Sequence, residues 1–260
     1  FVQIVARVVA FIMGASGSEA LSNAASVFVG QVEAQLLIRP YVKGMTMSEL
    51  LASMAGSMAC VAGGVLAVYI GLGIKASYLL TASIMAAPGA LVISKIVWPE
   101  TEESQTQGEV KVEVKKTNVN IIDAAAHGAS DGLRIGLNVV AMLIAFIALI
   151  ALGDACVGFL GKGLNYLGMN LNMIGLDLNN LKLQDIFGAI FAPFAFLLGV
   201  PWQDAHTVGI LMGEKLVINE FVAYSELSQM LKGQAEVSIG PKAETIATFA
   251  LCGFANFSSI

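Results

Sequence analysis

Two short apolar segments flank a carboxylate near the start of the chain, and this arrangement limits the possible fold more than any other feature. The segments cover residues 19–29 and 34–41, and the tip between them, from Gly30 to Glu33, brings an amide and a carboxylate into apolar surroundings. Each segment holds roughly ten residues, whereas a helix needs about 20 to cross a bilayer. In a membrane, this stretch therefore predicts a re-entrant helical hairpin. Non-helical backbone at that depth is tolerated only inside protein or beside a water-filled cavity.

The composition indicates that the chain lies in a membrane. Of its 260 residues, 57% are hydrophobic and 13% are charged, and the mean hydropathy is +0.77. These values predict an all-α, polytopic protein of the lipid bilayer. The formal net charge of −5 argues against a nucleic-acid partner, which requires a basic face. The cysteines, Cys60, Cys156 and Cys252, lack the spacing of a metal site, and we expect no cofactor.

A second hairpin with the same pattern is predicted late in the chain, where arms at 204–217 and 222–231 flank Glu220. An ionisable side chain at membrane depth costs roughly 2.5–3.5 kcal/mol, so it normally faces a cavity, a partner or a ligand. Glu33 and Glu220 are therefore candidate functional residues. The structural alternative is that each forms a buried ion pair with a nearby cation: Glu33 with Arg39, and Glu220 with Lys215.

The helix that follows the first hairpin is predicted over residues 46–71. It begins with a capping box, in which Thr46 and Glu49 satisfy each other's end of the helix. Gly63 and Gly64 lie in its middle, and glycine inside a helix costs roughly 1 kcal/mol relative to alanine. The pattern predicts either close helix packing or a functional break.

The helix that follows the second hairpin has a polar interruption. It begins at Gly240 and Pro241, since proline suits the first helical position, and it reaches the polar stretch 254–259. Each half of the chain thus contains a hairpin and then a broken transmembrane helix. Two such units in corresponding positions form an inverted repeat, which is typical of secondary transporters.

We divide the chain into five parts on this basis. They are the end of a preceding transmembrane helix (1–15), a first transport-core unit (16–99), an exposed loop (100–118), a region with a long scaffold or oligomerisation helix, an interfacial stretch and a short helix (119–200), and a second transport-core unit (201–260). Further helices are predicted at 77–98, with a bend at Pro88, at 121–152 and at 184–200, and residues 153–183 are expected at the membrane interface.

Several motifs together resemble one family, the concentrative nucleoside transporters. In chain order they are Gly30-Gln31-x-Glu33-Ala34, Leu36-Leu37-Ile38-Arg39-Pro40-Tyr41, Val61-Ala62-Gly63, residues 215–224 and residues 254–260. They cover essentially the whole chain. Members of that family are longer at both ends, so we expect a core fragment that is truncated at both termini.

The resemblance implies a homotrimer in the cell membrane, and for this chain we expect the bacterial inner membrane. Each subunit of such a protein imports a nucleoside by symport with sodium or protons through alternating access, and it is not an enzyme. Matched by motif position, the residues that contact the base are Gln31, Val32, Glu33 and Val65. Those at the ribose are Glu220, Asn256 and Ser259, and Phe254 packs on the nucleoside. Carboxylate and amide groups complement ribose hydroxyls and the mixed donors of a base edge.

The sequence departs from the family's pattern at the coupling site and at the hairpin tip. The resemblance implies a sodium site made by the Ser26 and Cys60 side chains and by the backbone carbonyls of Val29 and Val61. Ser26 and Cys60 stand where sodium-coupled members usually have Asn and Ser, and a thiol is a poor ligand for a hard cation. Proton coupling through Glu33 or Glu220 is the alternative.

Two further departures lie beside the carboxylate of the first hairpin. Val32 stands where the family usually has Thr or Ser, so that a hydroxyl group toward the base is missing, and Gln35 stands where it often has Pro. The base preference is therefore left open.

Two other classes of function also remain as alternatives. An intramembrane serine enzyme would use Ser258 or Ser259 with His206, although no nucleophile elbow or metal-ligand pair accompanies these residues. A passive channel for a polar solute is the other alternative.

Overall fold

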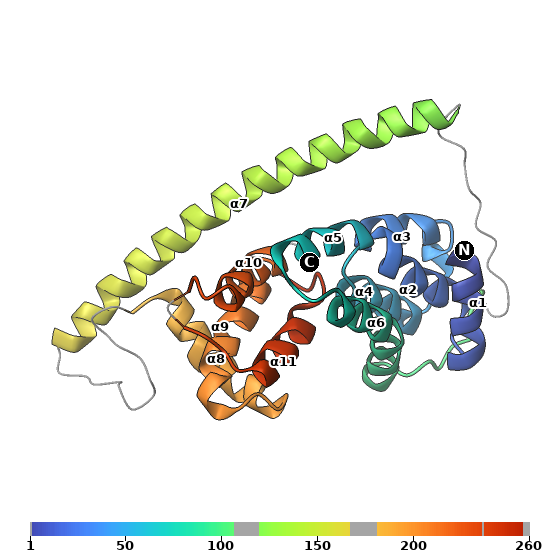
Figure 1. Ribbon diagram of the computed structural model, residues 1–260. Coiled ribbons are helices and arrows are strands. Elements are labelled where there is room, and N and C mark those ends of the chain that lie inside the picture. The colour runs from blue at the N-terminus through green and yellow to red at the C-terminus, as the bar shows by residue number, and fades with distance from the viewer. Residues whose placement is uncertain (1, 107–119, 167–180, 236, 257–260) are drawn as a thin grey trace. The chain divides into compact units, whose positions relative to one another are not determined.

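The computed structural model describes residues 2–106, 120–166, 181–235 and 237–256, and every regular element within these ranges is a helix (Figure 1). The chain divides into two compact units, which are residues 1–112 with 190–260, and residues 113–189. Each unit is described by itself. The all-helical prediction is confirmed for the described ranges.

The chain begins with three helices that pack in sequence. They are α1 (Val2–Met13), α2 (Gly17–Val29) and α3 (Gln31–Ile38), followed by the short 3₁₀ turn η1 (Val42–Gly44). Helices α2 and α3 pack against each other and form the first helix pair. A small apolar core joins all three helices, and it consists of Ala6, Leu21, Ala24 and Ile38.

The turn of the first helix pair requires glycine. Gly30 has φ 106° and ψ 169°, a backbone region that is essentially restricted to glycine. A Cβ atom at this position would also lie 2.8 Å from Glu33 Oε2 and 3.4 Å from Ala62 Cβ. The chain therefore reverses within one residue, at the predicted tip.

The next two segments are long and apolar enough to cross a membrane. One runs from Met47 to Leu72 and is broken into α4 (Met47–Ala59) and α5 (Gly63–Leu72), and the other is α6 (Ala76–Val97). The break falls at residues 60–62, directly before the two glycines, so the helix is interrupted where a break was one of the two alternatives. A function for this break stays a prediction. Helix α6 continues through Pro88, and a bend at that residue stays a prediction.

The second half of the first unit repeats the order of a helix pair and then a further helix. Helix α8 (Leu183–Leu197), of which residues 190–197 belong to this unit, is followed at an angle of 118° by α9 (Trp202–Val217). Helices α9 and α10 (Glu220–Leu231) pack together as the second helix pair, and Asn219 caps α10 by accepting the Val222 N–H at 3.0 Å. Helix α11 (Pro241–Leu251) completes a core with α5, α9 and α10.

The second unit consists mainly of one helix, α7 (Ile121–Tyr166), which has 46 residues and is therefore about 69 Å long. The prediction that this helix ends near residue 152 is wrong, because residues 153–166 continue it. The location of residues 153–183 at the membrane interface stays a prediction. Residues 153–166 contain several glycines but no proline, and isolated glycines are tolerated in a helix at roughly 1 kcal/mol each. Residues 167–180 lie outside the described ranges.

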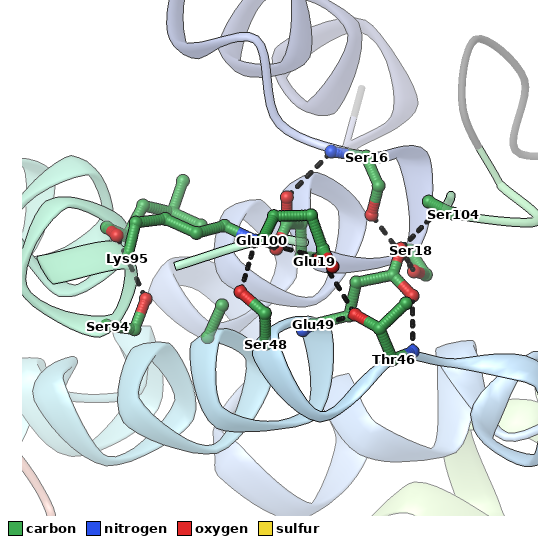
Figure 2. A network of polar contacts seen from close by, with 12 residues as sticks. Ser16, Ser18, Glu19, Thr46, Ser48, Glu49, Ser94, Lys95, Glu100 and Ser104 are labelled. Carbon is green, nitrogen blue, oxygen red and sulfur yellow. Dashed lines mark hydrogen bonds and ion pairs between the residues drawn. The ribbon is translucent and has the colours of Figure 1, made fainter. Parts of the chain in front are cut away.

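Two buried carboxylates, Glu19 and Glu49, cap the first turns of α2 and α4 (Figure 2). The first turn of α2, at the end away from Gly30, is the base of the first helix pair. Glu19 Oε1 accepts the Ser16 N–H at 2.7 Å. Glu49 Oε2 accepts the Thr46 N–H at 2.9 Å, and Thr46 Oγ1 accepts the Glu49 N–H at 3.1 Å. The predicted capping box is thus confirmed. Both carboxylate residues are only 1% exposed, so they also need partners from other elements.

Helix α6 and the segment after it supply those partners. Lys95 Nζ lies 2.8 Å from Glu19 Oε2, and the two side chains are 29% and 2% exposed. Glu49 Oε1 accepts hydrogen bonds from the Ser104 hydroxyl and, at 3.4 Å, from Thr106 Oγ1. Because Thr106 is buried, the loop predicted for 100–118 is not exposed throughout. Residues 107–119 lie outside the described ranges.

Replacing Lys95 with methionine should lower the free energy of unfolding by about 2–4 kcal/mol, because the buried Glu19 carboxylate would lose its cationic partner. Thermal or denaturant unfolding of the purified protein in detergent measures this change. Adding Glu19→Gln to Lys95→Met should restore part of the loss, since it removes the unpaired charge. The control is Lys242→Met at an exposed position. Equal stability of Lys95→Met and the control would contradict the assigned role.

Candidate functional site

The two breaks in the helices lie against each other. The first comprises residues 60–62, between α4 and α5, and the second follows α11 at Cys252. Gly253 has φ +133°, and a Cβ atom there would lie 2.8 Å from the Ala59 carbonyl oxygen. Only glycine allows this contact between the two backbones. The non-helical backbone of both halves is thus brought together in one place.

Glu220 lies at this place and joins three elements. It begins α10, is 5% exposed, and accepts hydrogen bonds from Tyr69 Oη at 3.0 Å and from Asn256 Nδ2 at 3.2 Å. Tyr69 belongs to α5, and Asn256 follows α11. The structure therefore brings together Glu220 and Asn256, which the sequence singled out. Tyr69 was missed, although it is the only residue of α5 whose side chain carries a polar atom.

Aromatic packing fixes the position of the Tyr69 hydroxyl. The Tyr69 ring lies 4.4 Å from the Tyr224 ring and 6.3 Å from the Phe221 ring, measured between centroids. Tyr69 and Tyr224 are fully buried members of the large core, and Val65 and Phe254 pack against the same core. Two predicted contacts of the nucleoside therefore lie beside the cluster that supports Glu220.

The ion pairs considered as structural alternatives do not form within the described ranges. Lys215 Nζ donates to the Ala250 carbonyl oxygen at 3.0 Å, and no ion pair joins it to Glu220. Among the same residues, none joins Arg39 to Glu33. Glu220 is instead held by two neutral donors. Its acceptor capacity is larger than these two bonds use, because a carboxylate has about four lone-pair sites.

The tip of the first helix pair lies against the first helix break. Besides the approach of Gly30 to Ala62, the Phe28 carbonyl oxygen lies 3.3 Å from the Cβ position of Gly63. Gln31 is half-buried, and its Oε1 atom is buried and has no hydrogen-bond partner among the described residues. Glu33 is exposed, although a carboxylate enclosed in apolar surroundings was expected. The Val32 side chain and Ser259 lie outside the described set.

Two of the side chains expected to bind sodium, those of Ser26 and Cys60, have hydrogen-bond partners in the structure. Ser26 is buried, and its hydroxyl donates to the Ser22 carbonyl at 2.7 Å and lies 3.3 Å from Ser57 Oγ. The Cys60 thiol instead lies 3.9 Å from the Ser83 carbonyl oxygen. The α4 side chain that contacts the Ser26 hydroxyl is thus that of Ser57, three residues before Cys60. Val61 is buried and Val29 is 42% exposed.

Comparison with known families gives a consistent result. The family described as "Na+ dependent nucleoside transporter C-terminus" matches residues 78–260. The uncharacterized transporter YutK of Bacillus subtilis is 46% identical over 250 residues, which are 96% of this chain and 58% of YutK. Sodium/nucleoside cotransporter 1 of Mus musculus is 43% identical and is matched over 95% of this chain and 38% of its own length.

Solved structures give the same relationship in three dimensions. CNTnw in an inward-facing, substrate-bound state superposes with a TM-score of 0.86 at 44% identity, over 99% of this chain and 57% of CNTnw. A CNTnw variant in an outward-facing state gives a TM-score of 0.85 at 43% identity. The chain thus spans about half the length, or less, of these relatives. They are transporters and not enzymes.

Replacing Tyr69 with phenylalanine should lower the free energy of unfolding by about 1.5–3 kcal/mol, because a hydrogen bond to a buried charged group is lost while the ring packing stays. Tyr78→Phe is the matched control, since its ring packs on Phe249 and its hydroxyl has no partner among the described residues. Thermal unfolding in detergent compares the two variants. A Tyr69→Phe protein as stable as Tyr78→Phe would show that this bond does not hold Glu220.

Proposed function

The chain belongs to the family of Na+ dependent nucleoside transporters, and from this premise we propose that it imports nucleosides across the cell membrane by symport with a cation. The observation that carries the proposal is the Glu220 carboxylate, which is buried where the two helix breaks meet and which retains free acceptor capacity. Vicinal ribose hydroxyls are donors that such a carboxylate can accept from.

In this proposal the ribose and the base contact different parts of the site. Glu220, Asn256 and Ser259 bind the ribose hydroxyls, and Tyr69 orients the Glu220 carboxylate. Phe254 and Val65 pack against the nucleoside, which their place beside the large core supports. Gln31, Val32 and Glu33 face the base. The unpartnered Gln31 Oε1 atom is suited to accept a hydrogen bond from an exocyclic amine or ring N–H.

We further propose that the two helix pairs are re-entrant hairpins of an inverted repeat, and that transport proceeds by alternating access. CNTnw has been captured in inward-facing, outward-facing and intermediate states, which supports this mechanism for the family. The exposed apolar side chains of α6, including Ile84, Ile93 and Ile96, support contact with lipid. A homotrimer in a bacterial inner membrane is part of the same proposal.

Sodium is the first candidate for the coupling ion, because the named mammalian relatives are sodium cotransporters. Protons are the second candidate, since the Cys60 thiol lies beside Ser83 and Ser26 offers a single hydroxyl. In the proton-coupled case, Glu33 or Glu220 carries the proton.

Uridine uptake into proteoliposomes that contain the full-length protein tests the function. A sodium gradient and a proton gradient are imposed separately, and we expect saturable accumulation above equilibrium with at least one of them. Accumulation driven by protons alone would exclude sodium coupling. Equilibration without accumulation under either gradient would indicate a passive channel and would overturn the symport proposal.

Replacing Glu220 with glutamine should lower nucleoside affinity by about tenfold to a hundredfold, since a hydrogen bond to a charged group contributes about 1.5–3 kcal/mol. Glutamine has a single acceptor oxygen, so it cannot serve Tyr69, Asn256 and a ribose hydroxyl together. Glu226→Gln on the same helix is the control. Calorimetric titration with uridine measures both, and unchanged affinity in Glu220→Gln would remove Glu220 from the site.

A further inference from the structure

A cluster of oxygen atoms surrounds the Gln35 side-chain amide, between α2, α3 and α4. Gln35 Nε2 lies 3.2 Å from Ser22 Oγ and 3.2 Å from the Ser53 carbonyl oxygen, and it also contacts Ser57 Oγ. The three serines are at most 4% exposed. One amide nitrogen therefore connects the two arms of the first helix pair to α4. We call this group the Gln35 cluster.

The Gln35 Nε2 atom has more oxygen neighbours than hydrogen atoms to donate. An amide NH₂ group carries two hydrogens, yet three oxygens lie within bonding distance of Nε2. The Ser53 hydroxyl has one hydrogen for Ser22 Oγ at 2.7 Å and Gln35 Oε1 at 3.0 Å. The Ser57 hydroxyl can donate to the Ser53 carbonyl at 2.9 Å. Hard cations prefer several oxygen ligands, so the position of Nε2, with three oxygens around it, is also suited to a cation.

The Gln35 cluster also lies next to the proposed substrate site. Gln31 and Gln35 are one helical turn apart on the same face of α3. Both of them, together with Ser57, line a cavity of about 580 Å³. The position of Gln31, whose Oε1 atom has no partner among the described residues, therefore depends on how firmly α3 is held against α4.

We propose that the Gln35 amide takes the place of a cation in this oxygen cluster, so that the first helix pair is fixed against α4 without a bound ion. Gln35 is then a positioning residue that acts on the substrate site through Gln31, and this part of the proposal rests on the proposed function. Among the described residues, the hydrogen bonds of the cluster do not involve the Cys60 thiol or the Val29 and Val61 carbonyls, which were considered as sodium ligands. It shares a contact with Ser26 through Ser57.

Substitutions at Gln35 distinguish a cation substitute from an ordinary packing residue. Gln35→Lys places an ammonium with three hydrogens among the three oxygens, and it should keep the melting temperature near that of the wild type. Gln35→Met has a similar length and no donor, so its melting temperature should be about 3–6 °C lower than that of the wild type. A tenfold decrease in the folding equilibrium constant gives a shift of this size in a chain of this length. If Gln35→Lys melts no higher than Gln35→Met, the proposal is overturned.

Gln35→Glu turns the same position into one that requires an ion. A carboxylate has no hydrogen for the Ser53 carbonyl, so at alkaline pH a bound sodium ion is needed to bridge the oxygens. Replacing choline with sodium should raise its melting temperature by about 3–6 °C more than that of the wild type. Gln229→Glu, exposed on α10, is the matched control. The same sodium response in Gln35→Glu and in the control would overturn the proposal.

Nucleoside binding separates failure of this inference from failure of the proposed function. If the wild type binds uridine, Gln35→Met should bind it more weakly, by about tenfold or more. Gln35→Glu should also bind uridine weakly in choline, and of these two variants only Gln35→Glu should regain affinity when sodium replaces choline. Equal uridine affinity in the wild type and in Gln35→Met would overturn the claim that Gln35 acts on the substrate site through Gln31. If the wild type binds no nucleoside, the proposed function fails, whereas the melting temperatures still decide whether the amide replaces a cation.

Discussion

A buried carboxylate must be matched by donors, and this constraint on Glu220 determines how the two halves of the first unit meet. The carboxylate is held by Tyr69 from α5 and by Asn256 from the segment after α11. Without these donors, an ionised group in apolar surroundings would cost several kcal/mol. The three elements therefore depend on one another. A ligand that brings hydroxyl donors can join this arrangement without breaking it, which makes the same place suitable for a sugar.

The first helix pair meets the same constraint with different partners. Glu19 is matched by the Lys95 ammonium, and Glu49 is matched by the Thr46 backbone N–H and by hydroxyls (Figure 2). Farther along the pair, the Gln35 amide is matched by serines. Polar groups thus hold the base and the middle of the pair. The tip is left with the half-buried Gln31 and the exposed Glu33, whose side chains are the ones available to a ligand.

Much of the local structure could be predicted from the sequence. The reversal at Gly30, the capping box at Thr46 and the break before Gly63 all follow from backbone preferences within a few residues. The end of α7 was predicted wrongly, because the glycines and polar residues after position 152 suggested that the helix stops there, whereas it continues to Tyr166. The burial of Thr106 was missed for another reason: its partners come from α2 and α4, and no local pattern reveals them.

By itself, the sequence determined the class of the protein, the order of its helices and the places where they break, because apolar run length, capping residues and glycine act locally. It also singled out Glu220 and Asn256. Only the tertiary structure decided which groups reach these residues. Tyr69 and Glu220 are 151 positions apart, and Ser57 rather than Cys60 faces Ser26. Such pairings depend on how whole helices pack and on where each side chain then points, and neither is encoded in the spacing of the residues along the chain.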